Sequence, residues 1–548
     1  MRHNVVLIGF MGTGKTAVGR AVAARLGLAF VDTDAMVEER DGRPVARIFA
    51  EDGEAAFRRL ESEAAAAAGD REGAVIATGG GIVLGAENMA RLRRRGMVVS
   101  LRASPAAILA RVGTGAGRPL LGDDPEARVR RLLDERGALY EDADLVVDTS
   151  DLSPDAIARC VEAFAVTWKG GARPAPAAAA DVPVQTVRVE TGARGYDVRI
   201  GAGLLGGIGR DLRGCGIAGR IAVLTHPRLR ALYGGALTSS LAGAGYEVTT
   251  VEVAPSEASK SLRVAARVYD ALLAARMDRA SALVVLGGGV AGDLGGFVAA
   301  TFLRGIAWAA VPTTLLGQVD AAIGGKTAVN HPRGKNLIGA VHQPALVVAD
   351  IDTLASLPAR EVRSGLAEAI KTGFIGAPDL VGYLEDHMPA VLRRRADALA
   401  RVVARCAAYK AEIVAGDERE EAGRVVLNYG HTIGHGVEAA AGYRGLTHGE
   451  AVAVGMVLEA TIAVRLGVCE AALAERQAAL LRRAGLPTRL SELRLPRPLS
   501  AAAVAEAMTH DKKARAGRLR FVLPAAVGQT VVRDDVPARL IEEVLGDG

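Results

Sequence analysis

Hydrophobic and polar positions divide the chain into stretches of different character. In residues 1–167, short β-branched runs alternate with Ala-, Arg-, Glu- and Leu-rich segments of helical period. This alternation is typical of βαβ units, so it predicts a parallel sheet with helices on both faces. Residues 168–183 contain Gly, Pro and Ala but almost no large apolar side chain, and we expect a linker there.

The pattern changes again beyond the linker. Residues 184–356 open with the alternating segments TVRVE and YDVRI and continue as βα units, which predicts a second α/β domain. In residues 357–548 strand signals almost vanish, and long Ala, Leu, Arg and Glu stretches predict a mostly helical domain. Three structural domains suit a chain of 548 residues, because a single hydrophobic core stops growing at about 250 to 300 residues.

Composition restricts the partners and the compartment. The net charge is only +5 and basic residues are scattered among acidic ones, which argues against nucleic acid and leaves phosphorylated metabolites open. The four cysteines lie far apart, so we expect buried thiols without disulfides at Cys160, Cys215, Cys406 and Cys469. No signal peptide is predicted, and apolar runs end before the ~20 residues that a membrane span needs. We therefore expect a cytoplasmic protein without a membrane partner.

A phosphate-binding loop is predicted at the N-terminus. The sequence GFMGTGKT, residues 9–16, matches GxxxxGK[ST] and stands between an apolar strand and a helical segment, as that motif requires. Backbone N–H groups would surround the phosphates of ATP, Lys15 would face the β and γ phosphates, and the Thr16 hydroxyl would ligate Mg²⁺. The ATP-binding residues predicted from the motif are Gly12, Thr13, Gly14, Lys15 and Thr16. The alternative is a glycine turn that only caps a helix.

Further motifs follow the phosphate loop within the same stretch. They are FVDTD with Asp32 and Asp34, FRRLE with Arg58, the triplet Gly79, Gly80 and Gly81, RPLL with Arg118, and RGALY with Arg136. With these motifs in this order, residues 1–167 resemble shikimate kinase. The rival families are other small phosphate-loop kinases, such as gluconate kinase and adenylate kinase, in which we do not expect this pair of arginines together with the glycine triplet.

The resemblance to shikimate kinase implies a role for each motif. Asp32 would hold magnesium through water, and Asp34 would accept a proton from the substrate hydroxyl. The shikimate site would consist of Asp34, Arg58, Gly79, Gly80, Gly81 and Arg136, and Arg118 would reach the phosphates of ATP from a mobile lid. The implied catalytic residues are Lys15, Asp34 and Arg118. Any one of these arginines alone would be typical of a solvated helix face.

A second glycine-rich turn follows the strand ALVVL. The segment GGGVAGD, from Gly287 to Asp293, satisfies GxGxxG. An ordinary dinucleotide-binding fold also has an acidic residue about 20 positions later for the ribose, and the segment IAWAAVPTT supplies none. The residues alone therefore predict only a pyrophosphate-binding turn.

Histidines are concentrated in one part of the chain. GHTIGH places His431 and His435 on one face of a helix, and His448 follows in THGE. Three of nine histidines within eighteen residues indicate a metal site. By spacing alone His431 and His435 would be the ligand pair, although Thr432 stands where HExxH has glutamate. The alternative is a set of helix histidines that hydrogen-bond to their neighbours.

From Val184 to the C-terminus the chain resembles 3-dehydroquinate synthase, and the resemblance implies its sites. Zn²⁺ or Co²⁺ would be bound by Glu368 of LAEAIK, His431 and His448, with His435 on the substrate side. NAD⁺ would be bound by Glu257, Lys260, Gly287, Gly288, Gly289, Asp293, Thr313, Thr314, Lys326 and Lys335. An anionic substrate would be bound by Arg304, Asp320, Lys335, Asn336, Lys371, Arg424 and His435. Catalytic roles are implied for Lys326, Lys371, Arg424, Asn428, His435 and Lys512. His226 departs from the family, in which Asp or Asn would hold a ribose hydroxyl.

The two resemblances together imply a bifunctional enzyme of the shikimate pathway. One half would phosphorylate the 3-hydroxyl of shikimate with ATP and Mg²⁺. The other would convert 3-deoxy-arabino-heptulosonate 7-phosphate into 3-dehydroquinate and phosphate, with NAD⁺ reduced and reoxidised in each turnover. A homodimer through the synthase half is also implied.

Two other functions remain as alternatives. The second half could be a metal-dependent polyol dehydrogenase, but Lys326, Lys335 and Lys371 argue against it because an uncharged polyol needs no such basic partners. A regulatory or scaffolding protein with degenerate sites is disfavoured, because both sets of motifs are complete apart from His226.

Overall fold

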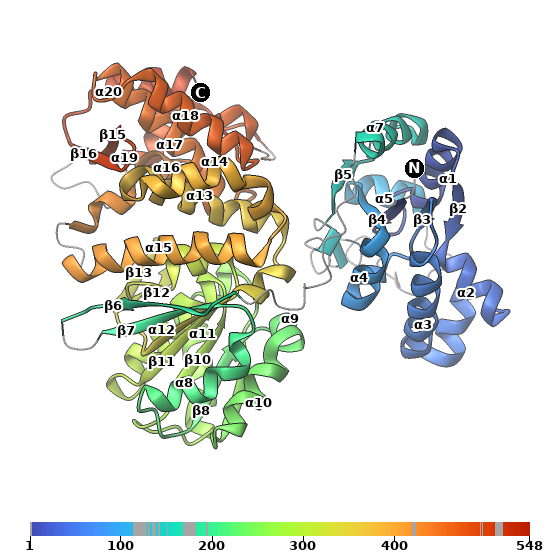
Figure 1. The fold of residues 1–548 in the computed structure, drawn as a ribbon, viewed down its shortest axis with the longest axis horizontal. Helices are drawn as coiled ribbons and strands as arrows, with labels where there is room; N and C mark the ends of the chain where they lie inside the picture. The colour runs from blue at the N-terminus through green and yellow to red at the C-terminus, as the bar shows by residue number, and fades with distance from the viewer. Residues whose placement is uncertain are drawn as a thin grey trace. The chain divides into compact units, whose positions relative to one another are not determined.

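The structure, a computed structural model, forms two compact units, residues 1–178 and 179–548 (Figure 1). It describes residues 3–112, 129, 132–133, 139–140, 143–150, 152–167, 182–192, 195–418, 423–493, 495, 497–509 and 519–547.

The first unit contains one parallel sheet of five strands in the order β2-β3-β1-β4-β5. The strands are β1 (Asn4–Gly9), β2 (Ala29–Asp32), β3 (Ala74–Ala77), β4 (Gly96–Arg102) and β5 (Leu145–Asp148). The helices are α1 (Lys15–Leu26), α2 (Thr33–Asp41), α3 (Val45–Gly69), α4 (Ala86–Arg95), α5 (Pro105–Val112) and α7 (Pro154–Thr167).

Helices cover both faces of this sheet, as the sequence predicts. Successive side chains of a strand point to opposite faces. In β1, Val5 and Leu7 pack in one apolar cluster with residues of α1 and α7, whereas Val6 and Ile8 pack in another with residues of α3, α4 and α5. The run VVLI is therefore apolar throughout because neither face of the central strand meets water.

The second unit begins with a sheet of seven strands in the order β6-β7-β14-β11-β10-β8-β9, parallel except for the pairing of β6 with β7. The strands are β6 (Gln185–Val189), β7 (Tyr196–Gly201), β8 (Ile221–Thr225), β9 (Val248–Glu252), β10 (Ala282–Gly287), β11 (Ala307–Pro312) and β14 (Leu346–Asp350). The larger helices that pack on it are α8 (Ile208–Gly214), α10 (Gly235–Gly243), α11 (Leu262–Ala274) and α12 (Gly289–Thr301).

A separate antiparallel hairpin leaves the main sheet after β11. Its strands are β12 (Lys326–His331) and β13 (Gly334–Val341), and β12 packs against α12. The sequence analysis expects only βα units up to this point and does not anticipate the hairpin. Its residues contact the helix that follows the glycine turn, so the hairpin lies close to the predicted dinucleotide site.

The rest of the second unit is mostly helical, as predicted. Its helices are α13 (Ala359–Gly376), α14 (Pro378–Leu392), α15 (Ala396–Gly416), α16 (His431–Ala440), α17 (His448–Arg465), α18 (Ala471–Arg483), α19 (Ala501–Thr509) and α20 (Ala538–Asp547). One antiparallel hairpin, β15 (Phe521–Ala526) with β16 (Gln529–Arg533), interrupts them. Phe521 and Leu523 of β15 are buried in an apolar cluster with α16 and α17, so the hairpin closes one side of the helical layer.

One expectation about the cysteines is wrong. Cys406 is buried, but Cys160 and Cys215 are exposed and Cys469 is half-buried, and the described residues form no disulfide. Wide spacing along the chain excludes a disulfide framework without deciding which helix face each thiol occupies. No described helix combines the length and the apolar character needed to cross a membrane.

The two units should fold separately. Each cluster of buried apolar side chains lies wholly within one unit, so a cut between them exposes no core. We expect chains of residues 1–178 and 179–548 to show one cooperative thermal transition each, measured by circular dichroism. A chain ended at residue 152, which lacks α7, should show none, because α7 covers the α1 face of the sheet. Aggregation of both separated halves would contradict this prediction.

Candidate active sites

The predicted phosphate loop connects β1 to α1. Gly12 and Gly14 adopt left-handed backbone conformations, with φ of 79° and 90°, which residues other than glycine rarely adopt. The Lys15 ammonium donates to the carbonyl oxygens of Gly9, at 2.8 Å, and Phe10, at 3.0 Å. The lysine thus folds across the loop that its sequence motif assigns to the phosphates.

Thr16 and Asp32, predicted to hold magnesium, lie together. The Thr16 hydroxyl donates to Asp32 Oδ2 at 3.0 Å, while Asp32 Oδ1 accepts from the backbone N–H of Asp34 at 3.1 Å. Asp32 is therefore the N-cap of α2, and this cap fixes the start of the helix on which Asp34 stands.

Asp34 has the electrostatic character of a proton acceptor. Burial raises the pKa of Asp34 to about 6, and the Lys15 ammonium opposes that rise. Its Oδ1 is buried and meets no hydrogen-bond donor among the described residues. A carboxylate with one open oxygen and a pKa near neutrality can accept a proton from a bound hydroxyl.

The glycine triplet makes room for charged side chains. A Cβ atom at Gly79 would lie 2.6 Å from Asp34 Oδ1, and one at Gly81 would lie 2.2 Å from a terminal nitrogen of Arg58. Arg58 also donates to Glu61 at 2.7 Å, and Glu61 is only 2% exposed. The sequence analysis misses Glu61, because a charged residue three positions after an arginine normally indicates a solvated helix face. Arg118 and Arg136 lie outside the described residues.

In the second unit, Glu368, His431 and His448 come together. One ligand atom of each lies within 4.8 Å of the other two. The carboxylate belongs to α13, and the two histidines are the first residues of α16 and α17. His435, one turn after His431, lies close by, with 5.3 Å between the two ring centroids.

The spacing of these atoms suits a tetrahedral metal ion. Glu368 Oε1 lies 3.6 Å from His431 Nε2 and 3.4 Å from His448 Nε2, too far for strong hydrogen bonds. Ligand atoms bound to zinc at about 2.0–2.2 Å in tetrahedral geometry lie about 3.4 Å apart. The three side chains therefore fit a zinc-sized cation, and the fourth position would be left to a substrate.

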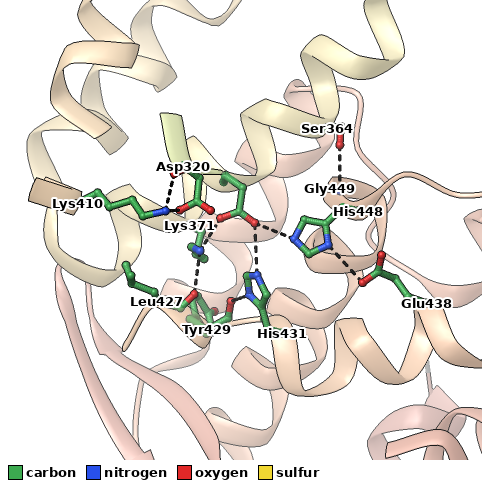
Figure 2. A network of polar contacts seen from close by, with 12 residues as sticks. Asp320, Ser364, Lys371, Lys410, Leu427, Tyr429, His431, Glu438, His448 and Gly449 are labelled. Carbon is green, nitrogen blue, oxygen red and sulfur yellow. Dashed lines mark hydrogen bonds and ion pairs between the residues drawn. The ribbon is translucent and has the colours of Figure 1, made fainter. Parts of the chain in front are cut away.

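Both histidines are oriented through their second ring nitrogen, as Figure 2 shows. His431 Nδ1 lies 3.0 Å from the carbonyl oxygen of Tyr429, and His448 Nδ1 lies 3.3 Å from Glu438 Oε2. These contacts direct each Nε2 toward Glu368, as in other metal sites whose histidines are held by outer oxygen atoms. Glu438 was not predicted, although it shares a helix face with the two histidines: His431 is at position i, His435 at i+4 and Glu438 at i+7.

Charge around Glu368 keeps it ionised. Burial alone would raise the pKa of this carboxyl, but Lys371, 2.5 Å away, and His448 lower it to about 2. Burial would lower the pKa of His448, but Glu368 and Glu438 raise it to about 10. A divalent cation would compete with that proton for the imidazole.

Three helices approach closely enough to assemble this centre. A Cβ at Gly449 would lie 2.1 Å from the carbonyl oxygen of Ser364, and the Gly449 N–H donates to the Ser364 hydroxyl oxygen at 3.0 Å (Figure 2). A Cβ at Gly455 would lie 2.0 Å from the carbonyl oxygen of Gly430. Glycine therefore permits the contacts of α17 with α13 and with the start of α16.

Buried cations lie beside the metal cluster. The Lys371 ammonium donates to the carbonyl oxygen of Leu427 at 2.8 Å, and Lys410 of α15 forms an ion pair with Asp320 at 2.8 Å (Figure 2). Lys410 is 7% exposed and was missed in the sequence analysis, since a single lysine in a long helix gives no local signal. Burial has the largest effect on both groups, and it lowers the pKa of Lys410. Burial would raise the pKa of Asp320, but the charges of Lys410 and Lys371 outweigh it and lower that pKa.

The other predicted substrate residues differ in their surroundings. Arg424 is 1% exposed and donates to the backbone carbonyl of Glu418 at 3.0 Å, but its Nε meets no acceptor among the described residues. Lys335, on β13, lies 4.5 Å from the ring centroid of Tyr443. Arg304 and Asn336 are exposed and have left-handed backbones, with φ of 67° and 54°. Asn428 is half-buried before α16, and Lys512 lies outside the described residues.

The predicted dinucleotide residues surround the glycine turn between β10 and α12. A cavity there is lined by Gly287, Gly288, Gly289, Pro312 and Lys326 among others. A Cβ at Gly288 would lie 2.8 Å from Thr314 Cγ2, so the turn packs closely on the segment after β11, where the Thr313 N–H donates to the Gly287 carbonyl at 3.1 Å.

Charged residues flank this turn. Lys260 forms an ion pair with Asp293, and Glu257 accepts from the Asn330 side chain at 2.7 Å. With an open glycine turn between them, these residues fit a dinucleotide with two ribose diols and a pyrophosphate.

His226 lies at the end of β8, the strand adjacent to β10. Its Nδ1 is buried without a hydrogen-bond partner among the described residues, and burial together with Arg228 lowers its pKa. In doubly wound sheets this strand end faces the adenosine ribose. A neutral imidazole can hydrogen-bond a hydroxyl, so the departure from an acidic residue does not remove that capacity.

Comparison with known proteins finds a matching family for each half of the chain. The shikimate kinase model matches residues 11–165, and the models for the N-terminal and C-terminal parts of 3-dehydroquinate synthase match residues 250–364 and 365–514. The chain is 46% identical over 365 residues to a 3-dehydroquinate synthase of Pelotomaculum thermopropionicum, covering 67% of this chain and 97% of that protein. It is 48% identical over 364 residues to that of Caulobacter vibrioides, covering 66% and 98%.

Solved structures with similar folds contain the expected cofactors. A 2-epi-5-epi-valiolone synthase of Streptomyces hygroscopicus, with NAD⁺ and Zn²⁺ bound, is 30% identical with a TM-score of 0.59 and covers 65% of this chain and 97% of its own. A 2-deoxy-scyllo-inosose synthase with carbaglucose-6-phosphate, NAD⁺ and Co²⁺ is 26% identical with a TM-score of 0.60 and covers 66% and 100%.

Asp34 should control the acid side of the first unit's activity. Because the acid form cannot accept a proton, kcat/KM for the acceptor should fall about tenfold per pH unit below 6 and level off above it. Asp34→Asn should lower kcat by about 100- to 10 000-fold and leave nucleotide binding intact. A rate profile that stays flat from pH 5 to 7 would contradict this role.

Gly449→Ala should separate α17 from α13. The added methyl group cannot lie 2.1 Å from a backbone oxygen, so the start of α17 must shift and take His448 away from Glu368. We expect a loss of about 1–3 kcal/mol in unfolding free energy, measured with urea, together with weaker zinc binding. Gly382→Ala in α14 is the matched control, since nothing lies within 4 Å of its added methyl group. Equal zinc affinity in the two variants would contradict the argument.

Proposed function

The chain belongs to the 3-dehydroquinate synthase family and carries a shikimate kinase domain before it, and from this we propose how its residues perform two reactions of the shikimate pathway. The first unit phosphorylates shikimate with ATP and Mg²⁺. The second converts 3-deoxy-arabino-heptulosonate 7-phosphate into 3-dehydroquinate and phosphate with NAD⁺ and zinc or cobalt.

In the kinase half, the residues position the phosphates of ATP and the carboxylate of shikimate, and they remove the proton of the shikimate hydroxyl. Lys15 and the loop glycines bind the phosphates, and Thr16 with Asp32 would hold Mg²⁺. Asp34 accepts the proton of the shikimate hydroxyl as that oxygen attacks the γ phosphorus. Arg58 binds the substrate carboxylate, and Glu61 orients its guanidinium. Arg118 and Arg136 complete this proposal from outside the described residues.

In the synthase half, one observation carries the proposal: the cluster of Glu368, His431 and His448 lies beside buried Lys371 and Lys410. Bound zinc would polarise a substrate hydroxyl that loses its proton, and NAD⁺ would take up and later return the hydride of the carbon atom that bears this hydroxyl. Those three side chains would hold the metal, and the glycine turn with Asp293 and Lys260 would hold the dinucleotide. The His435 ring lies 5.3 Å from that of His431 and 6.3 Å from that of His448 between centroids, and from there it would move a proton to or from the substrate.

Buried Arg424 favours an anionic substrate. Its Nε–H meets no acceptor among the described residues, whereas Lys371 and Lys410 are already paired with Glu368 and Asp320. Taking cations out of water is unfavourable unless an anion compensates them. A phosphorylated sugar acid supplies such anions and an uncharged polyol does not, which disfavours a polyol dehydrogenase.

The finer arrangement is also part of the proposal. We expect the synthase half to form a homodimer, because this is implied by its resemblance. The substrates are small molecules, and the cytoplasm, which supplies ATP and NAD⁺, is the expected compartment.

Phosphate release tests the synthase function directly. With NAD⁺ well below substrate, many phosphates should form per NAD⁺, because the hydride is returned in each turnover. A chelator should abolish the reaction and zinc should restore it. Glucose 6-phosphate, whose carba analogue is bound in 2-deoxy-scyllo-inosose synthase, is the control substrate and should react poorly. Release from glucose 6-phosphate alone would overturn the proposed substrate, and ADP formation with shikimate tests the kinase half independently.

A further inference from the structure

Glu459 is a fully buried carboxylate that neither reaction uses. It stands on α17, eleven residues after His448, and is 0% exposed. Its Oε2 accepts from the backbone N–H of Gly430 at 2.7 Å, and its Oε1 accepts from that of Ile433 at 3.1 Å. Gly430 is the N-cap residue of α16, and Ile433 belongs to the first turn of that helix.

Helix α16 cannot cap itself. Its N-cap residue is Gly430, which has no side chain and adopts a left-handed backbone with φ of 76°. The first N–H groups of a helix have no partner within the helix, and when they are buried another group must accept from them. Glu459 does so from a neighbouring helix, and its charge is favoured by the positive end of the helix dipole.

The position of α16 matters because one of its faces carries three functional side chains. His431, His435 and Glu438 stand at positions i, i+4 and i+7, which point in nearly the same direction around a helix. His431 is a predicted metal ligand, Glu438 orients the ligand His448, and His435 lies between them (Figure 2 shows His431, Glu438 and His448). A tilt or rotation of α16 would displace all three together.

A second contact holds the same end of the helix. The Tyr429 carbonyl lies 3.0 Å from His431 Nδ1, and the Tyr429 hydroxyl donates to Gln477 of α18 at 2.6 Å. Tyr429 therefore restrains the His431 imidazole from two residues earlier in the chain, while Glu459 restrains the backbone on either side of His431. The two contacts leave the first turn of α16 little freedom.

We propose that Glu459 is a positioning residue of the metal centre: by capping α16 from α17 it sets the orientation of His431, His435 and Glu438. It touches neither metal nor substrate and acts only through the backbone of α16. The inference rests on the proposed zinc site and extends it to a residue three turns away from the ligand on the same helix.

Glu459→Gln is the principal test, in the full-length chain. The amide keeps the size of the side chain but has one oxygen, so one of the two N–H groups loses its acceptor and faces an NH₂ group instead. We expect metal affinity to fall roughly 10- to 100-fold, as for other groups that orient metal ligands. Co²⁺ titration of metal-free protein gives the Kd, and the visible absorption of bound Co²⁺ reports the ligand geometry, which should change.

Asp350→Asn is the matched control. Asp350 is also a buried carboxylate, 2% exposed, and it accepts from the backbone N–H groups of Gly203 at 3.0 Å and Leu205 at 2.9 Å. It belongs to the same unit but caps no element of the metal centre. Its replacement should lower the Tm and leave both the Co²⁺ Kd and the Co²⁺ spectrum unchanged. Kinase activity in each sample reports the concentration of the chain, and the thermal transition of residues 179–548 reports whether the altered unit is folded.

The outcomes separate the possible roles of Glu459. A wild-type Kd and spectrum in Glu459→Gln would overturn the proposal, as would equal loss of affinity in the Asp350→Asn control. If Glu459→Gln does not fold, Glu459→Asp, which keeps the charge with a shorter reach, should bind Co²⁺ more weakly than wild type. Wild-type affinity in that variant would overturn the proposal too. Failure of the unaltered chain to bind Zn²⁺ or Co²⁺ would instead overturn the proposed synthase site, and this inference with it.

Discussion

The buried carboxylate of Glu368 is the charge on which the synthase half depends. A lone carboxylate at 1% exposure would be strongly unfavourable, so the fold surrounds it with Lys371 and two imidazoles. Those partners come from three helices, which must therefore approach closely. Gly449 and Gly455 allow this approach, because any side chain at either position would meet a backbone oxygen. The same close helix contacts therefore both pack the helical layer and bring the metal ligands together.

The same principle governs the kinase half on a smaller scale. There the glycine triplet after β3 leaves space that Asp34 and Arg58 fill, and Glu61 compensates the arginine. In both halves glycines allow close approach, in the kinase half of charged side chains and in the synthase half of helix backbones. Burial and neighbouring charges then set the pKa values of the carboxyl groups. Asp34 gains a pKa near neutrality from burial, whereas Glu368 stays ionised because cations outweigh its burial.

Each site also depends on groups that position other side chains of the site. Glu438 orients His448, Asp32 caps the helix that carries Asp34, and Glu459 caps the helix that carries His431. Such groups fix the orientation of the functional side chains, because each side chain or the helix that carries it is held by a second hydrogen bond. They are carboxylates in all three cases, and all accept hydrogen bonds that would otherwise go unmade inside the protein.

Features that depend on neighbouring positions along the chain could be predicted from the amino-acid sequence. Alternating apolar runs predicted the parallel sheet of the first unit, the spacing of GFMGTGKT predicted the phosphate loop, and the resemblance to known families assigned Glu368, which spacing alone had passed over in favour of His435. Tertiary structure decided the rest. Lys410, Glu61, Glu438 and Glu459 have no local signal, since a single charged residue in a helix is equally compatible with a solvated face. The β12–β13 hairpin and the exposed Cys160 were likewise decided by packing, because pairing and burial depend on neighbours that lie far away along the chain.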